Sequence, residues 1–277
     1  MAHGENAIVI ETDLESSLRQ NIHALGSVVV AYSGGVDSAV VLAVAAQELG
    51  ERALGITGIS PSIASGEADA AIALAREIGA RHETIATAEF DDERYRANPV
   101  NRCYFCKDEL YGKLDAIARE RGFVHVADGF NADDGTAPLD IRPGRAAAVR
   151  LGVRSPLAEA GVRKADVRAI AARLGLRVSD KPATPCLSSR IPHGTRIELD
   201  VLRRIDLAEQ FLRASGFPVV RVRHFGERAR VEVPTADIDR LQVRRIHVER
   251  ALREVGYGEI EIDPRGYRMG SLNDGEL

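Results

Sequence analysis

Two hydrophobic periods alternate along the first two thirds of the chain. Four short runs indicate strands, at residues 27–32, 53–58, 82–87 and 123–129. Stretches with apolar residues three and four positions apart predict helices, and each of these stretches is followed directly by a glycine. The predicted helices cover residues 12–25, 38–49, 66–78, 104–121 and 164–174. This alternation predicts a parallel sheet wrapped by helices.

The pattern changes after Lys181. Pro182, Pro185 and Pro192 lie in a segment without a clear hydrophobic period, which indicates a linker. The rest of the chain predicts an amphipathic helix, a hairpin of two alternating strands, a second helix and a last strand. These elements cover residues 198–215, 219–225, 228–233, 235–255 and 259–263. We therefore predict an α/β domain with a parallel sheet at about 1–185, followed by a smaller α+β domain at 186–277.

A loop with the sequence SGGVDS connects the first predicted strand to the helix that follows. Its residues are Ser33, Gly34, Gly35, Val36, Asp37 and Ser38. Two glycines let the backbone approach phosphate oxygens closely, and the helix start adds N–H groups, so the loop is suited to bind an anion. The aspartate can hold a metal ion on those oxygens, and the serine hydroxyls can donate to them. The loop matches neither the Walker A sequence nor the GxGxxG dinucleotide motif.

The composition disfavours several classes of protein. The 277 residues carry 37 basic and 41 acidic side chains, so the strongly basic surface typical of nucleic-acid-binding proteins is not expected. No apolar run is long enough for a membrane span and no secretory signal is recognised, which favours a cytoplasmic protein. The three cysteines are an odd number, and metal binding or catalysis explains them better than a disulfide framework does.

Cys103 and Cys106 form a CxxC motif, whereas Cys186 lies alone in the proline-rich segment. A single CxxC is compatible with a redox pair, half a zinc site or two small core residues. Zinc prefers four ligands, and no second CxxC and no CxxH completes such a set. Three thiolates can instead hold three irons of a [4Fe–4S] cluster and leave the fourth iron open to a ligand such as sulfide.

The SGGVDS loop resembles the PP-loop of ATP pyrophosphatases, which split ATP between its α and β phosphates. Four further motifs extend the resemblance over nearly the whole chain: RCYFCK at 102–107, DGFNADD at 128–134, IRPG at 141–144 and KPATPCLSSRIPHGT at 181–195. Together they resemble the LarE family of ATP-dependent sulfur transferases.

This resemblance implies a substrate and a reaction. The carboxylates of pyridinium-3,5-biscarboxylic acid mononucleotide would be adenylated by ATP and converted to thiocarboxylates, for the nickel-pincer cofactor of lactate racemase. The resemblance also implies Mg²⁺, cytoplasmic localisation, a homo-hexamer and a small-molecule nucleotide substrate. Other cofactor-assembly proteins are the implied protein partners, and neither nucleic acid nor a membrane is expected as one.

The LarE family contains two ways of supplying sulfur. Members with one cysteine sacrifice it, so that it becomes dehydroalanine, and Cys186 matches its position. Members with the additional CxxC are implied to bind a [4Fe–4S] cluster through three thiols, here Cys103, Cys106 and Cys186. Because this chain has these three cysteines and no others, we favour sulfide carried on the cluster, which attacks the acyl-adenylate and releases AMP. Sacrificial donation by Cys186 is the alternative.

Hydroxyl and charged side chains complete the expected nucleotide site. Thr57, at the carboxyl end of a predicted strand, is expected to line it. Lys107 is expected to contact the phosphates, although a solvated position on a helix explains it equally well. Asp134, or its neighbour Asp133, is expected to hold Mg²⁺ together with Asp37, and the alternative is an Asx turn.

Arginine side chains are expected to bind the two carboxylates and the phosphate of the substrate. The candidates are Arg190, Arg221 and Arg223. Arg221 and Arg223 share one face of a predicted strand, and ordinary surface exposure is the alternative explanation for both.

Three other functions fit parts of the pattern. Some PP-loop tRNA thiolases also carry three cysteines and a cluster, but the acidic charge balance and the lack of a recognisable RNA module disfavour them. NAD synthetases share the loop but do not need the cysteines. A regulatory module that senses iron or oxygen through the cysteines would bind ATP without forming AMP.

Overall fold

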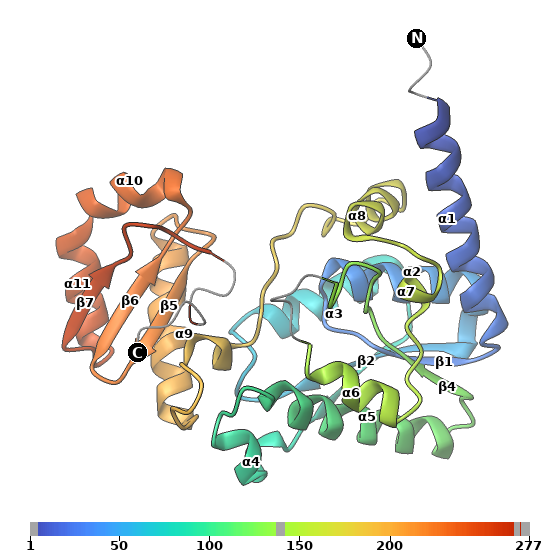
Figure 1. Ribbon diagram of the computed structural model, residues 1–277, viewed down its shortest axis with the longest axis horizontal. Coiled ribbons are helices and arrows are strands. Elements are labelled where there is room, and N and C mark those ends of the chain that lie inside the picture. The colour runs from blue at the N-terminus through green and yellow to red at the C-terminus, as the bar shows by residue number, and fades with distance from the viewer. Residues whose placement is uncertain (1–4, 137–141, 269–271, 273–277) are drawn as a thin grey trace. The chain divides into compact units, whose positions relative to one another are not determined.

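Four parallel strands form the sheet of the first of two compact units (Figure 1). The computed structural model describes residues 5–136, 142–268 and 272. The strands are β1 (Val28–Ala31), β2 (Ala53–Ile59), β3 (His82–Ala86) and β4 (His125–Ala127), in the order β3-β2-β1-β4. Each strand overlaps a run predicted from the sequence, and the parallel pairing of β1 with both β2 and β4 confirms the predicted α/β class.

Helices cover both faces of this sheet because successive strand side chains point to opposite sides. Val28 and Val30 pack on one face, and Val29 and Ala31 pack on the other. The first face is covered by α1 (Glu5–Ala24), α2 (Val36–Leu49), α3 (Glu67–Ile78), α7 (Pro156–Glu159) and α8 (Lys164–Arg173). The second face is covered by α5 (Arg102–Glu120) and α6 (Gly144–Arg150). Burial on both faces explains why the central strand β1 is a continuous apolar run, whereas the edge strand β3 is only partly buried and carries polar residues.

The carboxyl ends of β1 and β4 lie next to each other, since Val30 is paired with Ala127 in a parallel register. The chain segments that follow these two strands therefore leave the sheet at the same edge, where ligands of such sheets bind. Gly129 makes their close approach possible, because a Cβ on this residue would lie 2.7 Å from the backbone nitrogen of Ser38.

A three-stranded sheet with the order β5-β6-β7 organises the second unit. β5 (Arg221–Phe225) and β6 (Arg228–Glu232) form the predicted antiparallel hairpin, and β7 (Glu259–Ile262) runs parallel to β6. The helices of this unit are α4 (Glu93–Arg96), α9 (Leu199–Ala214), α10 (Ile238–Val243) and α11 (Arg245–Glu254). Leu212 of α9 packs with Val222 and Val231 of the sheet in one apolar core. These elements make up the expected α+β arrangement.

The helices depart from the expectation in two ways. The single helix predicted over 235–255 is divided, because Arg244 leaves the helical path with φ −95° and ψ 7°. The short helices α4, α6 and α7 and the 3₁₀ turns were not predicted, since segments of three to seven residues are too short to show a hydrophobic period. The 3₁₀ turns are Gly50–Arg52, Glu89–Asp91, Leu187–Arg190 and Thr235–Asp237. None of the helices in the described ranges combines the length and apolar character that a membrane span needs.

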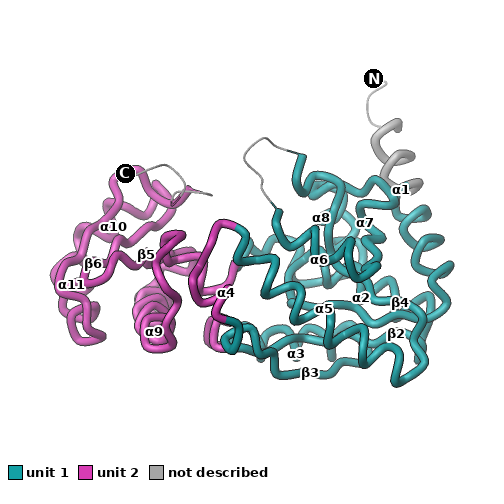
Figure 2. Tube along the Cα trace, turned by 60° about the horizontal axis from the view of Figure 1, so that its bottom comes forward, with its two compact units in different colours: residues 1–60, 66–92, 101–184 teal, residues 61–65, 93–100, 185–277 magenta. Residues whose placement is uncertain are grey.

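The second unit includes two short segments from the first half of the sequence (Figure 2). The first unit comprises 1–60, 66–92 and 101–184, and the second comprises 61–65, 93–100 and 185–277. The side-chain amide of Asn98 donates to the carbonyl oxygens of Pro192 and Thr195 at 2.8 and 2.9 Å. The phenol oxygen of Tyr95 lies 2.8 Å from the hydroxyl of Ser188. These contacts join segments that lie far apart in the sequence: 94 residues separate Asn98 from Pro192, and 93 separate Tyr95 from Ser188.

Two histidines, the partly buried His82 and the buried His224, are expected to make the stability of the fold depend on pH. Burial lowers the pKa of His82 and of His224, so the neutral forms are favoured in the folded chain. The unfolded chain binds protons at a higher pH, near the ordinary value of 6.5. The free energy of unfolding is therefore expected to fall as the pH decreases through 6.5 towards the lower folded pKa.

Urea unfolding at a series of pH values between neutrality and moderate acidity measures this slope. His224→Gln is expected to reduce the slope, whereas the control His247→Gln, at an exposed position, is expected to retain it. An unfolding free energy that does not change over this range in the unmodified protein would contradict the prediction.

Candidate functional site

The SGGVDS loop follows β1 and becomes the first turn of α2. Gly34 has a φ of 71°, in the left-handed region that favours glycine. A Cβ on Gly34 would also lie only 2.8 Å from the Cβ of Ala71 in α3, so a side chain there has no room. Gly35 precedes α2 in an extended conformation, and Val36 opens the helix with its side chain buried. The loop thus depends on glycine for both its conformation and its packing.

The two serine hydroxyls of the loop hold its shape. The hydroxyl of Ser38 accepts a hydrogen bond from the amide of Ser33 at 3.2 Å and donates one to the carbonyl of Gly35 at 3.1 Å. The hydroxyls of Ser33 and Ser38 lie 3.2 Å apart. Ser38 is buried and Ser33 is exposed. Ser33 is therefore the serine of this loop that a ligand in solvent can reach directly.

The carboxylate of Asp37 is held by residues from two other segments. Its Oδ2 lies 2.5 Å from Nζ of Lys164, the first residue of α8. Its Oδ1 accepts a hydrogen bond from the side-chain amide of Asn131 at 3.2 Å. Lys164 was not among the residues predicted from the sequence, and no local signal identifies it, because 127 positions separate it from Asp37.

Asp128 follows β4 and is buried beneath this edge of the sheet. Its carboxylate accepts hydrogen bonds from the phenol of Tyr111 at 3.0 Å and from the hydroxyl of Ser155 at 2.8 Å. The amide of Phe130 donates to it at 3.1 Å. Asp128 therefore fixes the course of the segment that carries Asn131 to Asp134.

Asp134 has a partner on each carboxylate oxygen. The amide of Asn131 donates to Oδ2 at 3.1 Å, and the guanidinium of Arg142 lies 2.8 Å from Oδ1. Ile141, which belongs to the IRPG motif, lies outside the described residues. Carboxylate and amide oxygens are the donor types that Mg²⁺ prefers, so Asp37 and Asp134 fit the chemistry of that ion. Within the described parts of the chain, no three His, Cys, Asp or Glu side chains converge in a group that could hold a metal ion.

Lys107 lies in the first turns of α5, directly after Cys106. Its Nζ is 5.2 Å from the centre of the Tyr111 ring, and its stem packs against Gly144, where a Cβ would come within 2.8 Å of Cγ. Tyr111 raises the pKa of Lys107 more than burial lowers it, and Cys106 and Asp128 add to the rise. Burial raises the pKa of Tyr111 itself to about 12. Lys107 is therefore a permanent cation beside the CxxC motif.

Thr57 is buried at the carboxyl half of β2. Its hydroxyl donates to the carbonyl of Tyr32 at 2.8 Å and lies 2.8 Å from Nε2 of His82. The hydroxyl therefore links β2 and β3 to Tyr32, the residue between the end of β1 and the SGGVDS loop. A contact of Thr57 with the nucleotide stays a prediction.

The two parts of the predicted sulfur site lie in different units. Cys103 and Cys106 lie three residues apart near the start of α5, with Cys103 exposed and Cys106 partly buried. This spacing places both residues on the same side of the helix. Cys186, which is also partly buried, precedes the 3₁₀ turn Leu187–Arg190 in the second unit. None of the three takes part in a disulfide.

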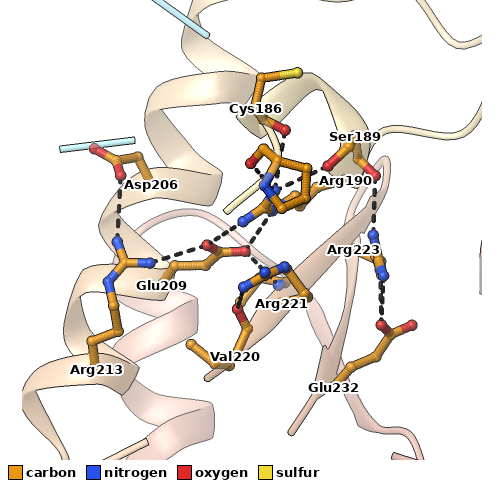
Figure 3. A network of polar contacts seen from close by, with 12 residues as sticks. Cys186, Ser189, Arg190, Asp206, Glu209, Arg213, Val220, Arg221, Arg223 and Glu232 are labelled. Carbon is orange, nitrogen blue, oxygen red and sulfur yellow. Dashed lines mark hydrogen bonds and ion pairs between the residues drawn. The ribbon is translucent and has the colours of Figure 1, made fainter. Parts of the chain in front are cut away.

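The backbone around Cys186 is held by Arg190, whose side chain is completely buried. One guanidinium nitrogen, Nη1, donates to the carbonyl oxygens of Pro185 and Cys186 at 2.6 and 3.1 Å. Figure 3 shows that the carbonyl oxygen of Cys186 faces the guanidinium, whereas its sulfur points away from it. Arg190 thus orients the cysteine through its backbone and leaves the thiol on the other side.

Glu209 of α9 neutralises Arg190. Its Oε1 and Oε2 lie 2.8 and 2.9 Å from Nε and Nη2 of Arg190, which is a bidentate pair with no exposed side-chain surface. The amide of Val222 donates to Oε1 at 3.0 Å, and Arg213 donates to Oε2 at 3.2 Å. Burial alone would raise the pKa of Glu209, but the hydrogen bonds and charge of Arg190 outweigh it and lower the pKa. Glu209 was not predicted from the sequence as part of the site.

The other two candidate arginines lie on β5 and are buried, with 4% of Arg221 and 6% of Arg223 exposed. Ordinary surface exposure, the alternative explanation for both, is therefore wrong. Arg223 pairs with Glu232 at 2.8 Å and donates to the carbonyl of Ser189 at 3.0 Å. The guanidinium of Arg221 lies 5.1 Å from the centre of the Tyr267 ring, and burial together with the charge of Arg190 lowers its pKa. The network of Figure 3 therefore joins Cys186 to a group of buried cations.

Comparison with known proteins extends over nearly the whole chain. The sequence profile of the NAD synthase family matches residues 10–112. An uncharacterised protein of Synechocystis sp. is 43% identical over 96% of this chain and 98% of its own length. The pyridinium-3,5-bisthiocarboxylic acid mononucleotide synthase of Lactiplantibacillus plantarum is 37% identical over 90% of each chain. An uncharacterised protein of Methanocaldococcus jannaschii is 27% identical over 87% of this chain and 90% of its own length.

The double requirement for glycine at position 34 is testable. Gly34→Ala is expected to lower the free energy of unfolding by more than Gly26→Ala. Gly26 has nearly the same φ, 70°, but no atom within 4 Å of an added Cβ. The control therefore measures the conformational cost alone, about 1–2 kcal/mol. Equal losses in denaturant unfolding would show that the contact with Ala71 does not limit this position.

Removing Arg190 is expected to leave Glu209 buried without its main partner. Arg190→Ala should therefore lower the free energy of unfolding by about 3–5 kcal/mol. It should also speed amide hydrogen exchange at residues 186–190. The matched control is Arg213→Ala. Arg213 is a second partner of Glu209, but its own side chain is 29% exposed, so its removal should lower the free energy of unfolding by about 1 kcal/mol or less. Similar losses for the two variants, measured by urea unfolding, would contradict the assignment.

Proposed function

The chain belongs to the LarE family of ATP-dependent sulfur transferases, and we propose that it converts the carboxylates of pyridinium-3,5-biscarboxylic acid mononucleotide to thiocarboxylates. The observation that carries this proposal is the 37% identity over 90% of the chain with a synthase of the bisthiocarboxylic product. The SGGVDS loop and the three cysteines supply the two kinds of chemistry that such a conversion needs.

The first step of the proposed reaction activates the substrate. A carboxylate oxygen attacks the α-phosphorus of ATP, and pyrophosphate leaves. The backbone N–H groups at the start of α2 and the exposed hydroxyl of Ser33 lie at the edge of the sheet where an anion would bind. They would stabilise the negative charge that develops on the leaving pyrophosphate.

Two aspartates are proposed to hold Mg²⁺ during this step. Asp37 and Asp134 carry the oxygen donors that suit it, and when bound the ion would neutralise charge on the phosphate oxygens. Thr57 and Lys107 complete the proposed nucleotide site. Lys107 would act through its charge, since its raised pKa keeps it protonated.

The second step delivers sulfur to the acyl-adenylate. A sulfur nucleophile attacks the activated carboxyl carbon, the carbon–oxygen bond to AMP breaks, and AMP leaves with the bonding electrons. We propose that Cys186 belongs to the sulfur site, because its backbone is fixed by Arg190 while its sulfur points away from that contact. The network around it therefore constrains the cysteine without engaging the thiol.

Cys103 and Cys106 are proposed to share an iron–sulfur cluster with Cys186. Their residue types suit it: thiols at i and i+3 on one helix lie on the same side, and none of the three cysteines is in a disulfide. When bound, a [4Fe–4S] cluster with three protein thiolates has one iron open to an exogenous ligand. The chain's own contribution would be to supply the three thiolates and, through Lys107, a positive charge next to Cys106.

Arg221 and Arg223 are proposed to bind the anionic groups of the substrate. Both are buried, and Arg223 already pairs with Glu232 and donates to the carbonyl of Ser189, so the substrate would have to replace these contacts. Arg190 was predicted to share this role, but its donors are directed at Glu209 and at the backbone of Pro185 and Cys186, so we propose that it positions Cys186 instead. A homo-hexamer, cytoplasmic localisation and contacts with other cofactor-assembly proteins belong to the same proposal.

Incubation of the anaerobically purified protein with ATP, Mg²⁺, sulfide and the biscarboxylic mononucleotide tests the function. Mass spectrometry is expected to detect exchange of oxygen for sulfur in the substrate, with one AMP and one pyrophosphate for each sulfur transferred. AMP formation without a thiocarboxylate, or no AMP with this substrate, would contradict the proposal. A tRNA that gains sulfur under the same conditions would point to a thiolase instead.

Serine variants of the cysteines distinguish the two sulfur routes. If the three thiols act together, Cys103→Ser, Cys106→Ser and Cys186→Ser should each abolish product and lower the iron and sulfide content of the purified protein. If Cys186 is sacrificed, Cys103→Ser should retain single-turnover activity. The mass of the protein should then fall by the loss of hydrogen sulfide from Cys186.

A further inference from the structure

Asn98 is a completely buried residue in a strained backbone conformation, and the reaction described so far gives it no role. Its φ is 53°, in the left-handed region, and among the residues that the structure describes no other non-glycine residue has a positive φ. Asparagine tolerates this region better than most residues do, but Pro99, which follows it, favours an extended conformation there. Such strain persists where surrounding contacts impose it, and it is common near functional sites.

Three short hydrogen bonds connect Asn98 to the loop at residues 191–195. The side-chain Nδ2 donates to the carbonyl oxygens of Pro192 and Thr195 at 2.8 and 2.9 Å. The backbone carbonyl of Asn98 accepts a hydrogen bond from the amide of Gly194 at 2.9 Å. A single buried side chain therefore satisfies two carbonyl groups of this loop, and its backbone satisfies an amide.

The residues just before Asn98 bind the same stretch of chain on both sides of that loop. The phenol oxygen of Tyr95 lies 2.8 Å from the hydroxyl of Ser188, and both residues are buried. The amide of Ile197 donates to the carbonyl oxygen of Arg96 at 2.8 Å. The two segments are thus joined at several points, of which Asn98 provides the most.

Each of the joined segments leads to a cysteine of the proposed sulfur site. Ser188 follows Cys186 by two residues, and Cys103 follows Asn98 by five. Five residues of extended chain span at most about 18 Å. The hydrogen bonds of Asn98 therefore limit how far Cys103 can lie from the loop at 191–195.

We propose that Asn98 is a positioning residue of the sulfur site. It holds the segment after Cys186 beside the segment that leads into α5, so that the thiol of Cys186 stays within reach of Cys103 and Cys106. This role needs no contact with sulfur or substrate, because Asn98 acts through the loop at 191–195. The inference rests on the proposed function, since it assumes that the three thiols act together.

A bifunctional thiol reagent tests this role without iron or substrate. Dibromobimane should join Cys186 to Cys103 or Cys106 in the reduced, iron-free protein, as detected by peptide mass spectrometry. Asn98→Gly accepts the same φ but lacks the side-chain donors. The yield of that cross-link should fall about tenfold in this variant, since two hydrogen bonds are lost. The cross-link between Cys103 and Cys106, which lie on one helix, is the internal reference and should not change.

Two further variants separate positioning from stability. Tyr95→Phe keeps the buried ring and removes the contact with Ser188, so it should lower the yield of the same cross-link by a smaller factor, about threefold. Val248→Ala truncates a buried residue in the core of the second unit. It should lower the melting temperature and leave the cross-link unchanged.

Iron content then separates the inference from the proposed function. Loss of the cross-link in Asn98→Gly, together with fewer irons per chain after anaerobic reconstitution, would support both. A cross-link that depends on Asn98 in a protein that binds no iron would support the positioning role and contradict the cluster. The inference would be overturned if the cross-link were absent from the unmodified protein, unchanged in Asn98→Gly, or reduced as strongly in Val248→Ala. Thiocarboxylate formation by the unmodified protein would still support the proposed function in these cases.

Discussion

The parallel pairing of β1 with β4 is the constraint on which the nucleotide edge depends. Because Val30 is opposite Ala127, the segments that leave the two strands emerge side by side. The loop at 33–38 and the segment at 128–134 are then close enough for Asn131 to reach Asp37. Gly129 permits this approach, since any larger residue would meet the first turn of α2. If β4 ran antiparallel to β1, its amino end would lie at this edge of the sheet, and the segment 128–134 would leave from the opposite edge.

The central carboxylate of each unit forms an ion pair, and the two pairs differ in their exposure to solvent. Asp37 and Lys164 are partly exposed, so water screens their attraction and either can change partner. Glu209 and Arg190 have no exposed side-chain surface, and separation would leave a charge buried without compensation. The first pair therefore leaves a carboxylate that a ligand in solvent can reach. The second suits the fixed support of a reactive segment.

The strands and the loop after β1 could be predicted from the sequence, whereas the contacts that the charged side chains make could not. Strand-like runs identified the four strands of the first sheet, and the SGGVDS motif identified the loop after β1. Lys164 and Glu209 were missed because a hydrogen-bond partner far along the chain creates no local period. Arg190 was recognised as a candidate but expected to contact substrate, since the type of a residue does not reveal its burial. Glu209 lies on the apolar side of an amphipathic helix, and that is the one signal that could have marked it.

The division of the chain between the two units has a consequence for its synthesis. The chain passes from one unit to the other five times, after residues 60, 65, 92, 100 and 184. Asn98 leaves the ribosome long before Pro192 and Thr195, the residues whose carbonyl oxygens it binds. Residues 61–65 and 93–100 must therefore wait without their final partners until the C-terminal stretch has been translated. If the first unit folds before residues 185–277 have been translated, it forms its sheet while these two segments still lack their partners.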